Sequence, residues 1–250
     1  MTTTTLKQKM ARASVGVLAA GLIIGQAAQA SAGTAVAPVA HTSVLTASSA
    51  APCEHADTPM RPRSAYSHGH KGYEVYKRDR RHIASAVLCL VNAERQAANL
   101  PVFPGTEALR IAAKRHANES VAEGWWGKAT PGKNCRPVKD QSGRDTDQCD
   151  PHYNPQTGST AESRISDTGY VTGCTSWWIG ENAYVGWGPG KATARAAVDW
   201  WMHSPGHRTN ILNPKFTDMG AGVNGGSADP DGAAVNPSGT FVQDFGHCDR

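Results

Sequence analysis

Three motifs that would indicate a reaction class are absent from this chain. It has no Cys-x-x-Cys pair, which argues against zinc-finger and thioredoxin-like sites. It also has neither the His-Glu-x-x-His motif of zinc peptidases nor the Gly-x-Ser-x-Gly elbow of serine hydrolases. The sequence therefore argues against these signatures, and any chemistry must come from residues that folding brings together.

Charge and apolar runs give no support for a nucleic-acid or membrane-spanning protein. Lys7, Lys9 and Arg12 precede an apolar run over 15–25 and a small-residue cleavage site, which predicts a secretory signal peptide over residues 1–30. Without these basic residues the balance is 25 − 3 = 22 Lys+Arg against 21 Asp+Glu, so nucleic-acid binding loses its electrostatic basis. No later run is long enough to span a bilayer, so we expect a secreted protein without a transmembrane segment.

The cysteine count indicates disulfide bonds. An even number, six, in a chain predicted to be exported favours disulfides over thiolate metal ligands. The spacing leaves most pairings open. We predict only the pair Cys135–Cys149, because it closes a short loop within a segment rich in Gly, Pro and Asp.

Composition divides the rest of the chain into a spacer and one domain. Residues 31–78, rich in Ala, Ser, Thr, Pro and His, predict a disordered spacer, and residues 79–250 predict one domain with an insertion at about 124–151. Periodic apolar patterns predict helices near 81–98, 106–123, 161–168 and 192–202, and alternating patterns predict strands at 218–224 and 240–246. Helices first and strands late favour an α+β class.

The most specific stretch is 176–212. It places Glu181 in a Gly-Glu-Asn motif and His207 in a Ser-Pro-Gly-His-Arg turn, and glycine lets backbone approach whatever these side chains face. His152, upstream, would complete a His/Glu/His cluster. Such a cluster suits a divalent metal ion, zinc first, or general acid–base work.

Structural alternatives compete with each of these roles. Glu181 would cap backbone donors on an exposed loop, and His207 would occupy the third position of a short turn that Ser204 caps. His116 lies on the alanine-rich stripe of the second predicted helix, so we expect it to be a hydrogen-bonded core residue. No orienting acid is near enough in sequence to make Ser204 and His207 a nucleophile–base pair.

Six short motifs in this order resemble the CAP superfamily of cysteine-rich secretory, antigen 5 and pathogenesis-related proteins, in its bacterial secreted branch. They lie at 90–95, 109–117, 180–182, 201–212, 220–223 and 241–246. The resemblance covers residues 80–247. It implies an α-β-α sandwich, in which a three-stranded antiparallel sheet lies between helical layers, with a His/Glu/Glu/His tetrad in a cleft.

The resemblance assigns the cleft residues one by one. Glu181 matches the acid of the family's Gly-Glu-Asn motif, His207 matches the histidine of its Gly-His motif, and His152 matches its upstream histidine. The second acid falls near Ser204, which departs from the tetrad. The insertion leaves an alternative alignment, in which Lys128 takes the position of His152 and a ligand is lost.

The sequence supports three functional hypotheses. The first is a secreted CAP-domain protein whose His152, Glu181 and His207 hold a divalent ion, zinc first, that would polarise a carbonyl or activate a water. In a metal-free version Glu181 is the general base and a histidine the acid. The second is a binding protein for a small molecule, a peptide, a lipid, a sterol or a cell-wall component, and the third is a disulfide-stapled scaffold. No reaction is assigned, because a fold alone does not license an activity.

Overall fold

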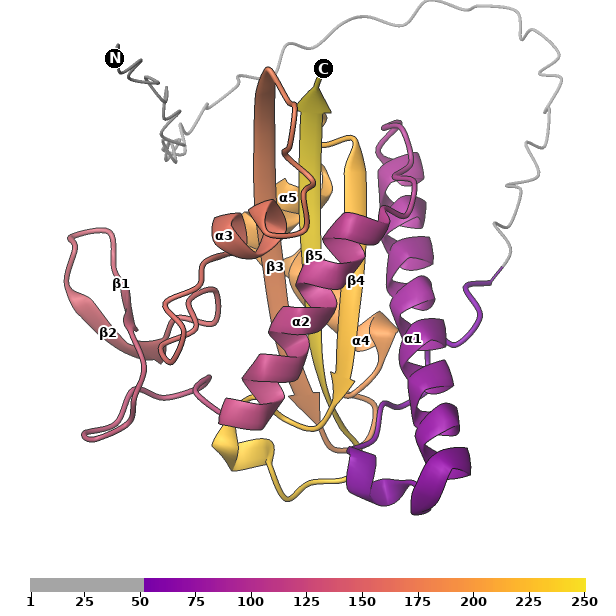
Figure 1. Cartoon of the computed structure of the whole chain (residues 1–250), viewed down its shortest axis with the longest axis vertical. Helices are drawn as coiled ribbons and strands as arrows, with labels where there is room; N and C mark the ends of the chain where they lie inside the picture. The colour runs from indigo at the N-terminus through magenta and orange to yellow at the C-terminus, as the bar shows by residue number, and fades with distance from the viewer. Residues whose placement is uncertain (1–51) are drawn as a thin grey trace, which may run out of the picture. The chain divides into compact units, whose positions relative to one another are not determined.

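A three-stranded antiparallel sheet in the order β3-β5-β4 separates two layers of helices (Figure 1). The computed structural model describes residues 52–250. The strands are β3 (Ser176–Trp187), β4 (Asp218–Gly225) and β5 (Ser238–Asp249). This arrangement confirms the α-β-α sandwich and the α+β class. The predicted signal peptide, 1–30, and residues 31–51 of the predicted spacer lie outside the described residues.

The helices lie on both faces of the sheet. The pair α2 and α3 covers one face, and the group α1, α4 and α5 covers the other (Figure 1). Their bounds are α1 (Gly69–Ala97), α2 (Glu107–Glu123), α3 (Ala161–Ser166), α4 (Ala194–His203) and α5 (Pro205–Ile211), with short 3-10 helices at Arg63–Ala65 and Pro230–Gly232. Four of the α-helices match the predicted helical segments, and α5 matches the turn that Ser204 was expected to cap.

The larger hydrophobic core lies between the sheet and the layer of α1, α4 and α5. The predicted stripe of α1, Ile83, Val87 and Val91, is fully buried there against residues such as Trp201 and Phe245. The face under α2 has smaller side chains, mainly alanines, so this helix approaches the sheet closely. Burial of these stripes stabilises the fold by roughly 25 cal/mol for each Å² of apolar surface.

The start of α1 corrects the predicted boundary between spacer and domain. The helix begins at Gly69, twelve residues before Arg81, so residues 52–78 of the predicted spacer 31–78 belong to the ordered domain. Tyr76 is buried, and its hydroxyl donates to Asn224 and accepts from the backbone N–H of Gly225 on β4. The basic run over 77–82 hid this start because its charges are typical of a solvated helix end.

Strand β3 was not located from the sequence. The interpretation of Glu181 as a structural residue places it on an exposed loop. In the structure it lies in the middle of this twelve-residue strand. Gly180 and Gly186 have the appearance of turn residues. In the structure they permit close contact instead, because an added Cβ would lie 2.9 Å from the Phe216 ring at Gly180 and 2.1 Å from the carbonyl of Lys191 at Gly186.

The segment predicted as an insertion forms a small hairpin away from the main sheet. Strands β1 (Pro137–Lys139) and β2 (Asp145–Cys149) pair antiparallel. The predicted disulfide Cys135–Cys149 is present and closes this hairpin. The hairpin therefore ends three residues before His152, at the edge of the candidate site.

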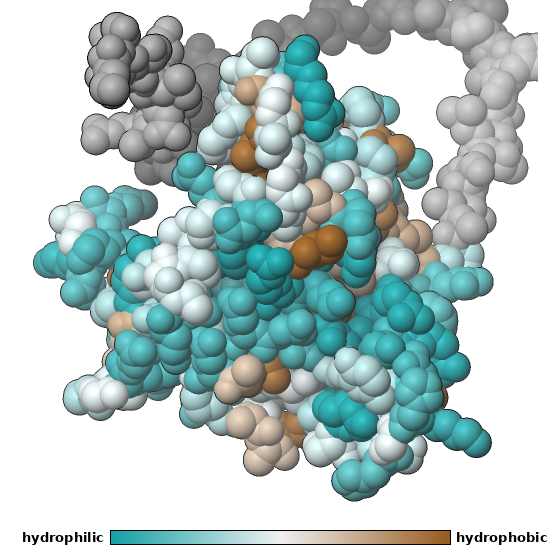
Figure 2. Space-filling model, in the orientation of Figure 1, coloured by the Kyte–Doolittle hydropathy of each residue, from teal (hydrophilic) through white to brown (hydrophobic). Residues whose placement is uncertain are grey.

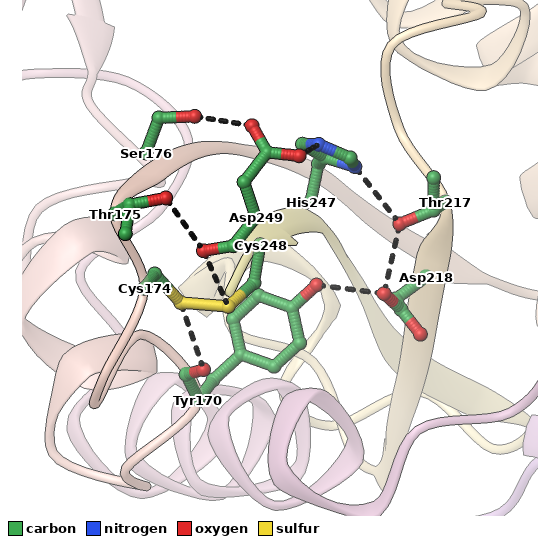
Figure 3. Close-up of a disulfide and its surroundings, with 9 residues drawn as sticks. All are labelled: Tyr170, Cys174, Thr175, Ser176, Thr217, Asp218, His247, Cys248 and Asp249. Atoms are coloured by element: carbon green, nitrogen blue, oxygen red, sulfur yellow. Dashed lines mark hydrogen bonds and ion pairs between the residues drawn. A yellow bond between two sulfur atoms is a disulfide. The ribbon is translucent and has the colours of Figure 1, made fainter.

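Two further disulfides fasten the ends of the domain. Cys53–Cys89 ties the segment before α1 to the middle of that helix, and Cys174–Cys248 ties the segment before β3 to the end of β5. Figure 3 shows the second bond and its neighbour Tyr170, whose hydroxyl donates to Asp218 at 2.9 Å. All six cysteines are paired, which agrees with an oxidising compartment.

The solvent face over α2 and α3 is mostly hydrophilic. Figure 2 shows hydrophobic residues on this face only as scattered spots among polar ones, as is normal for a water-exposed surface. Within residues 52–250 no helix combines the length and apolar character needed to cross a membrane.

The contact of β4 with α2 yields a stability prediction. A Cβ at Gly222 would lie 2.2 Å from the backbone of Ala113 and Lys114, so Gly222→Ala must push β4 and α2 apart. We expect it to lower the free energy of unfolding by about 3 kcal/mol, measured by urea titration. The control is Gly206→Ala in α5, where a Cβ meets nothing within 4 Å and stability should rise slightly. Equal effects in the two variants would contradict the close approach.

Candidate functional site

Glu181 is the centre of a buried polar cluster. Its side chain is 2% exposed and points from β3 toward α3 and the segment that carries His152. Arg164 Nη2 donates to both carboxylate oxygens, at 2.8 Å and 3.0 Å, and His152 Nδ1 donates to Oε1 at 2.8 Å. A buried carboxylate is thus paired with a cation and satisfied by hydrogen bonds, the condition under which its burial is tolerated.

Local structure delivers Arg164 and His152 to this carboxylate. A capping box between Thr160 and Ser163 starts α3, which carries Arg164. The same guanidinium donates to the carbonyl of His152 at 3.1 Å, and Asp150 Oδ1 accepts from the His152 backbone N–H at 2.9 Å. Both ends of the His152 backbone are therefore fixed, which orients its ring toward Glu181.

His207 is positioned by the start of α5. Ser204 is the N-cap and Pro205 the first helical residue, as predicted. The Ser204 Oγ lies 2.7 Å from His207 Nδ1 rather than capping the backbone. The His207 carbonyl accepts from Asn182 Nδ2 at 3.1 Å, and this amide, the residue after Glu181, also bonds Asn210 and Gln243. The Gly-Glu-Asn motif thus fixes α5 on the sheet through its asparagine.

Two carboxyl groups share the cluster, and their pKa values shift in opposite directions. Burial alone would raise the pKa of Glu181, but His116, His152 and Arg164 hold it well below its usual range. Asp244 lies directly opposite on β5 and is fully buried. Burial, and then the charge of Glu181, raise the pKa of Asp244 well above its ordinary value. The opposite shifts favour the ionised form of Glu181 and the protonated form of Asp244.

The three histidines near Glu181 differ in protonation. Burial opposes the charge of His152, but the hydrogen bond and negative charge of Glu181 raise its pKa above 6.5. Burial lowers the pKa of His116 to about 4. Burial, and then the charge of His152, lower the pKa of His207 to about 4. The site thus holds His152, whose pKa is raised, together with His207, whose pKa is lowered.

The structure brings together some of the predicted site residues and adds others. His152 contacts Glu181, whereas Lys128, the alternative at that position, is exposed on the hairpin side and forms a bridge with Gln148. No hydrogen bond or ion pair in the part of the chain that the structure describes joins His207 to Glu181. The catalytic roles predicted for Glu181, His207 and His152 stay predictions.

The sequence did not predict that three further residues, His116, Arg164 and Asp244, belong to the cluster. His116 is buried as predicted and donates to the Pro151 carbonyl at 2.8 Å, but its Nε2 also lies 3.7 Å from Glu181. No role was predicted for Arg164. Asp244 had one signal, a charged residue between Gln243 and Phe245 in a strand predicted from its alternating pattern.

The contacts do not fit a metal ion held by His152, Glu181 and His207. The oxygens of Glu181 already accept three contacts from donors, and the guanidinium of Arg164 lies where it would repel a cation. Among residues 52–250 no group of three or more His, Cys, Asp and Glu side chains is arranged to hold a metal. Zinc binding therefore stays a prediction without support from this geometry.

Comparison with known proteins identifies the family. The model described as "CAP: Cysteine-rich secretory protein family" matches residues 88–245, and the chain belongs to this family. A curated relative, the "Uncharacterized protein YkwD" of Bacillus subtilis (strain 168), is 37% identical over 85 residues, 34% of this chain and 29% of that protein. This chain thus matches less than a third of that relative's length.

Solved structures to which this chain is similar include proteins of three bacteria. An extracellular protein containing an SCP domain from Bacillus anthracis str. Ames has a TM-score of 0.47 and 18% identity, over 74% of this chain and 45% of that one. An outer surface protein of Borrelia burgdorferi has a TM-score of 0.41 and 18% identity, over 65% of this chain and 90% of that one. A cysteine-rich secretory protein of Staphylococcus aureus has a TM-score of 0.38 and 14% identity, over 66% of this chain and 38% of that one.

Burial of His116 predicts a loss of stability in acid. Its pKa is about 4 in the folded state against 6.5 as a free side chain, so the unfolded chain takes up the proton first as pH falls. The contribution of the neutral, buried His116 to the free energy of unfolding is complete above pH 6.5 and is lost between pH 6.5 and 4. From pH 7 to pH 5 the loss is about 2 kcal/mol.

His116→Gln, which keeps an N–H donor for the Pro151 carbonyl, should remove this part of the acid sensitivity. Urea unfolding at pH 7 and pH 5 measures the difference between the two proteins. The exposed His203→Gln in α4 is the control and should leave the pH dependence unchanged. An unchanged pH dependence in His116→Gln would mean that His116 does not titrate as inferred.

Proposed function

We propose that this chain is an extracellular CAP-domain binding protein whose cleft holds a small amphipathic ligand, with a polar head between His152 and His207. The observation that carries the proposal is the internal saturation of Glu181. Because Arg164 and His152 occupy its carboxylate, this acid fixes the cleft wall and is not free to act on a ligand. Among the described residues the Nε2 atoms of His152 and His207 make no hydrogen bond, and the His152 side chain is 38% exposed.

An aromatic pocket of about 300 Å³ beside the histidines supports an apolar body for this ligand. Trp126, Tyr184 and Trp200 contribute to its wall, and Pro151 links it to His152. Trp200 is 48% exposed, and its ring centre lies 4.8 Å from that of His207. Exposed aromatic surface next to a few fixed polar groups is typical of small-molecule sites.

An extracellular location is part of the proposal. Three disulfides stabilise the described domain, and such bonds persist in oxidising compartments. The signal-peptide pattern over residues 1–30 and the family's description as secretory point the same way. An exported domain would bind its ligand outside the cell, at a membrane surface or in the cell wall.

Titration with sodium octanesulfonate, followed by tryptophan fluorescence, tests the cleft. We expect Trp200→Ala to weaken binding about tenfold, because a hot-spot aromatic ring is lost. Affinity should also rise from pH 8 to pH 6 as His152, with its raised pKa, becomes charged. Octanol, which is neutral, should show no such rise.

The matched control is Trp177→Ala, which removes a tryptophan of 37% exposure that does not line the pocket. Its affinity should equal that of the unaltered protein. Equal losses in the two tryptophan variants, or no binding by the unaltered protein, would reject the cleft as the binding site.

Acid–base catalysis is the second candidate, because His152 and His207 favour opposite protonation states. Neutral His207 would be the base and protonated His152 the acid. Hydrolysis of p-nitrophenyl acetate should then show a bell-shaped pH profile with its acidic limb near 4. The rate should fall to background in both His152→Gln and His207→Gln. Rates equal to those of the unaltered protein would exclude this reaction.

A further inference from the structure

A second concave site lies at the free edge of β4, between α1 and α2. Its volume is about 460 Å³, and its floor includes Leu88, Met219 and Ala221. Strand β4 is one edge of the sheet and β3, which carries Glu181, is the other. The groove is therefore separate from the histidine cleft, and its role is independent of the function proposed for that cleft.

The backbone of β4 is only partly satisfied along this edge. The Met219 carbonyl accepts from the backbone N–H of Thr106 at 3.0 Å, and the Val223 carbonyl accepts from Arg80 Nε at 2.6 Å. Alternate residues of a strand direct their backbone groups to the same side. Ala221, midway between them, thus turns its N–H and C=O to the groove, where neither has a partner among the described residues.

The rim of this groove carries an excess of positive charge. Lys77 and Arg110 line it but are paired, with Glu74 and Glu107. Within residues 52–250 no carboxylate lies within ion-pair distance of the other basic side chains of the rim, which are Arg80, Arg81 and Lys114. Burial, and then the positive charges of Arg80 and Arg110, lower the pKa of Lys114, as expected where cations crowd together.

We propose that this groove binds an extended peptide segment rich in carboxylate side chains. The peptide pairs its backbone with the N–H and C=O of Ala221 and places carboxylates against Arg81 and Lys114. An exposed strand edge is a template for adding a strand, and the surrounding charge selects the added chain. A second copy of this protein fits poorly, because its own β4 edge would bring the same positive charges against these.

The probe is a fluorescein-labelled hexapeptide of alternating Glu and Val, and its binding to the full chain is measured by fluorescence anisotropy. We expect saturable binding that weakens with added salt, and no binding of the matching Lys–Val peptide. The double variant Arg81→Glu/Lys114→Glu should weaken binding about tenfold or more. The control Lys128→Glu/Lys191→Glu changes the net charge equally at exposed positions outside the groove and should bind as the unaltered protein does.

Backbone pairing is tested on the ligand, so that the protein stays intact. Methylation of the central amide nitrogen of the peptide removes one N–H donor and should weaken binding about tenfold. Equal affinity for the methylated peptide would overturn pairing with Ala221. Equal loss in the two charge variants, or no binding of the Glu–Val peptide, would overturn the site. Displacement of the peptide by dodecanoate at lower concentration than by unlabelled peptide would assign the groove to an anionic lipid instead and overturn the proposal.

Discussion

The pairing of Glu181 with Arg164 inside the domain is the interaction on which the site depends. Both side chains are 2% exposed, so neither charge is stabilised by bulk water. Removing one partner of such a pair leaves an uncompensated buried charge, which typically costs about 3–5 kcal/mol. Helix α3, the segment around His152 and the middle of β3 are therefore held in one arrangement.

The register of the sheet adds a constraint on that charge. Because β3 and β5 pair with Glu181 opposite Asp244, two carboxyl groups meet in a buried region, and their surroundings favour ionisation of Glu181 over that of Asp244. Asp244 and the network of Asn182, Asn210 and Gln243 continue the polar layer toward α5. The pKa values of the two histidines differ for another reason: the contact with Glu181 outweighs burial at His152, whereas burial and then the charge of His152 lower the pKa of His207.

How far the sequence predicted the fold depended on how local each signal was. The stripe of Ile83, Val87 and Val91 and the alternation in β5 are periodic patterns, and both elements formed where expected. The first turns of α1 and the whole of β3 were not found. Charges over 77–82 and glycines within β3 have the composition of loops. Only contacts distant in sequence, such as Tyr76 with Asn224 and Gly180 with Phe216, make these segments regular.

The sequence by itself determined the family, the class of fold and the disulfide Cys135–Cys149, and it offered His152 and Lys128 as alternative neighbours of Glu181. These rest on short motifs whose residues are fixed by local backbone requirements or by loop closure. Tertiary structure alone decided which groups complete the cluster. Arg164, His116 and Asp244 come from three separate elements, and their charge states depend on burial and mutual distance. No pattern along the chain encodes a distance across a sheet, so only the folded domain reveals that Glu181 is already satisfied.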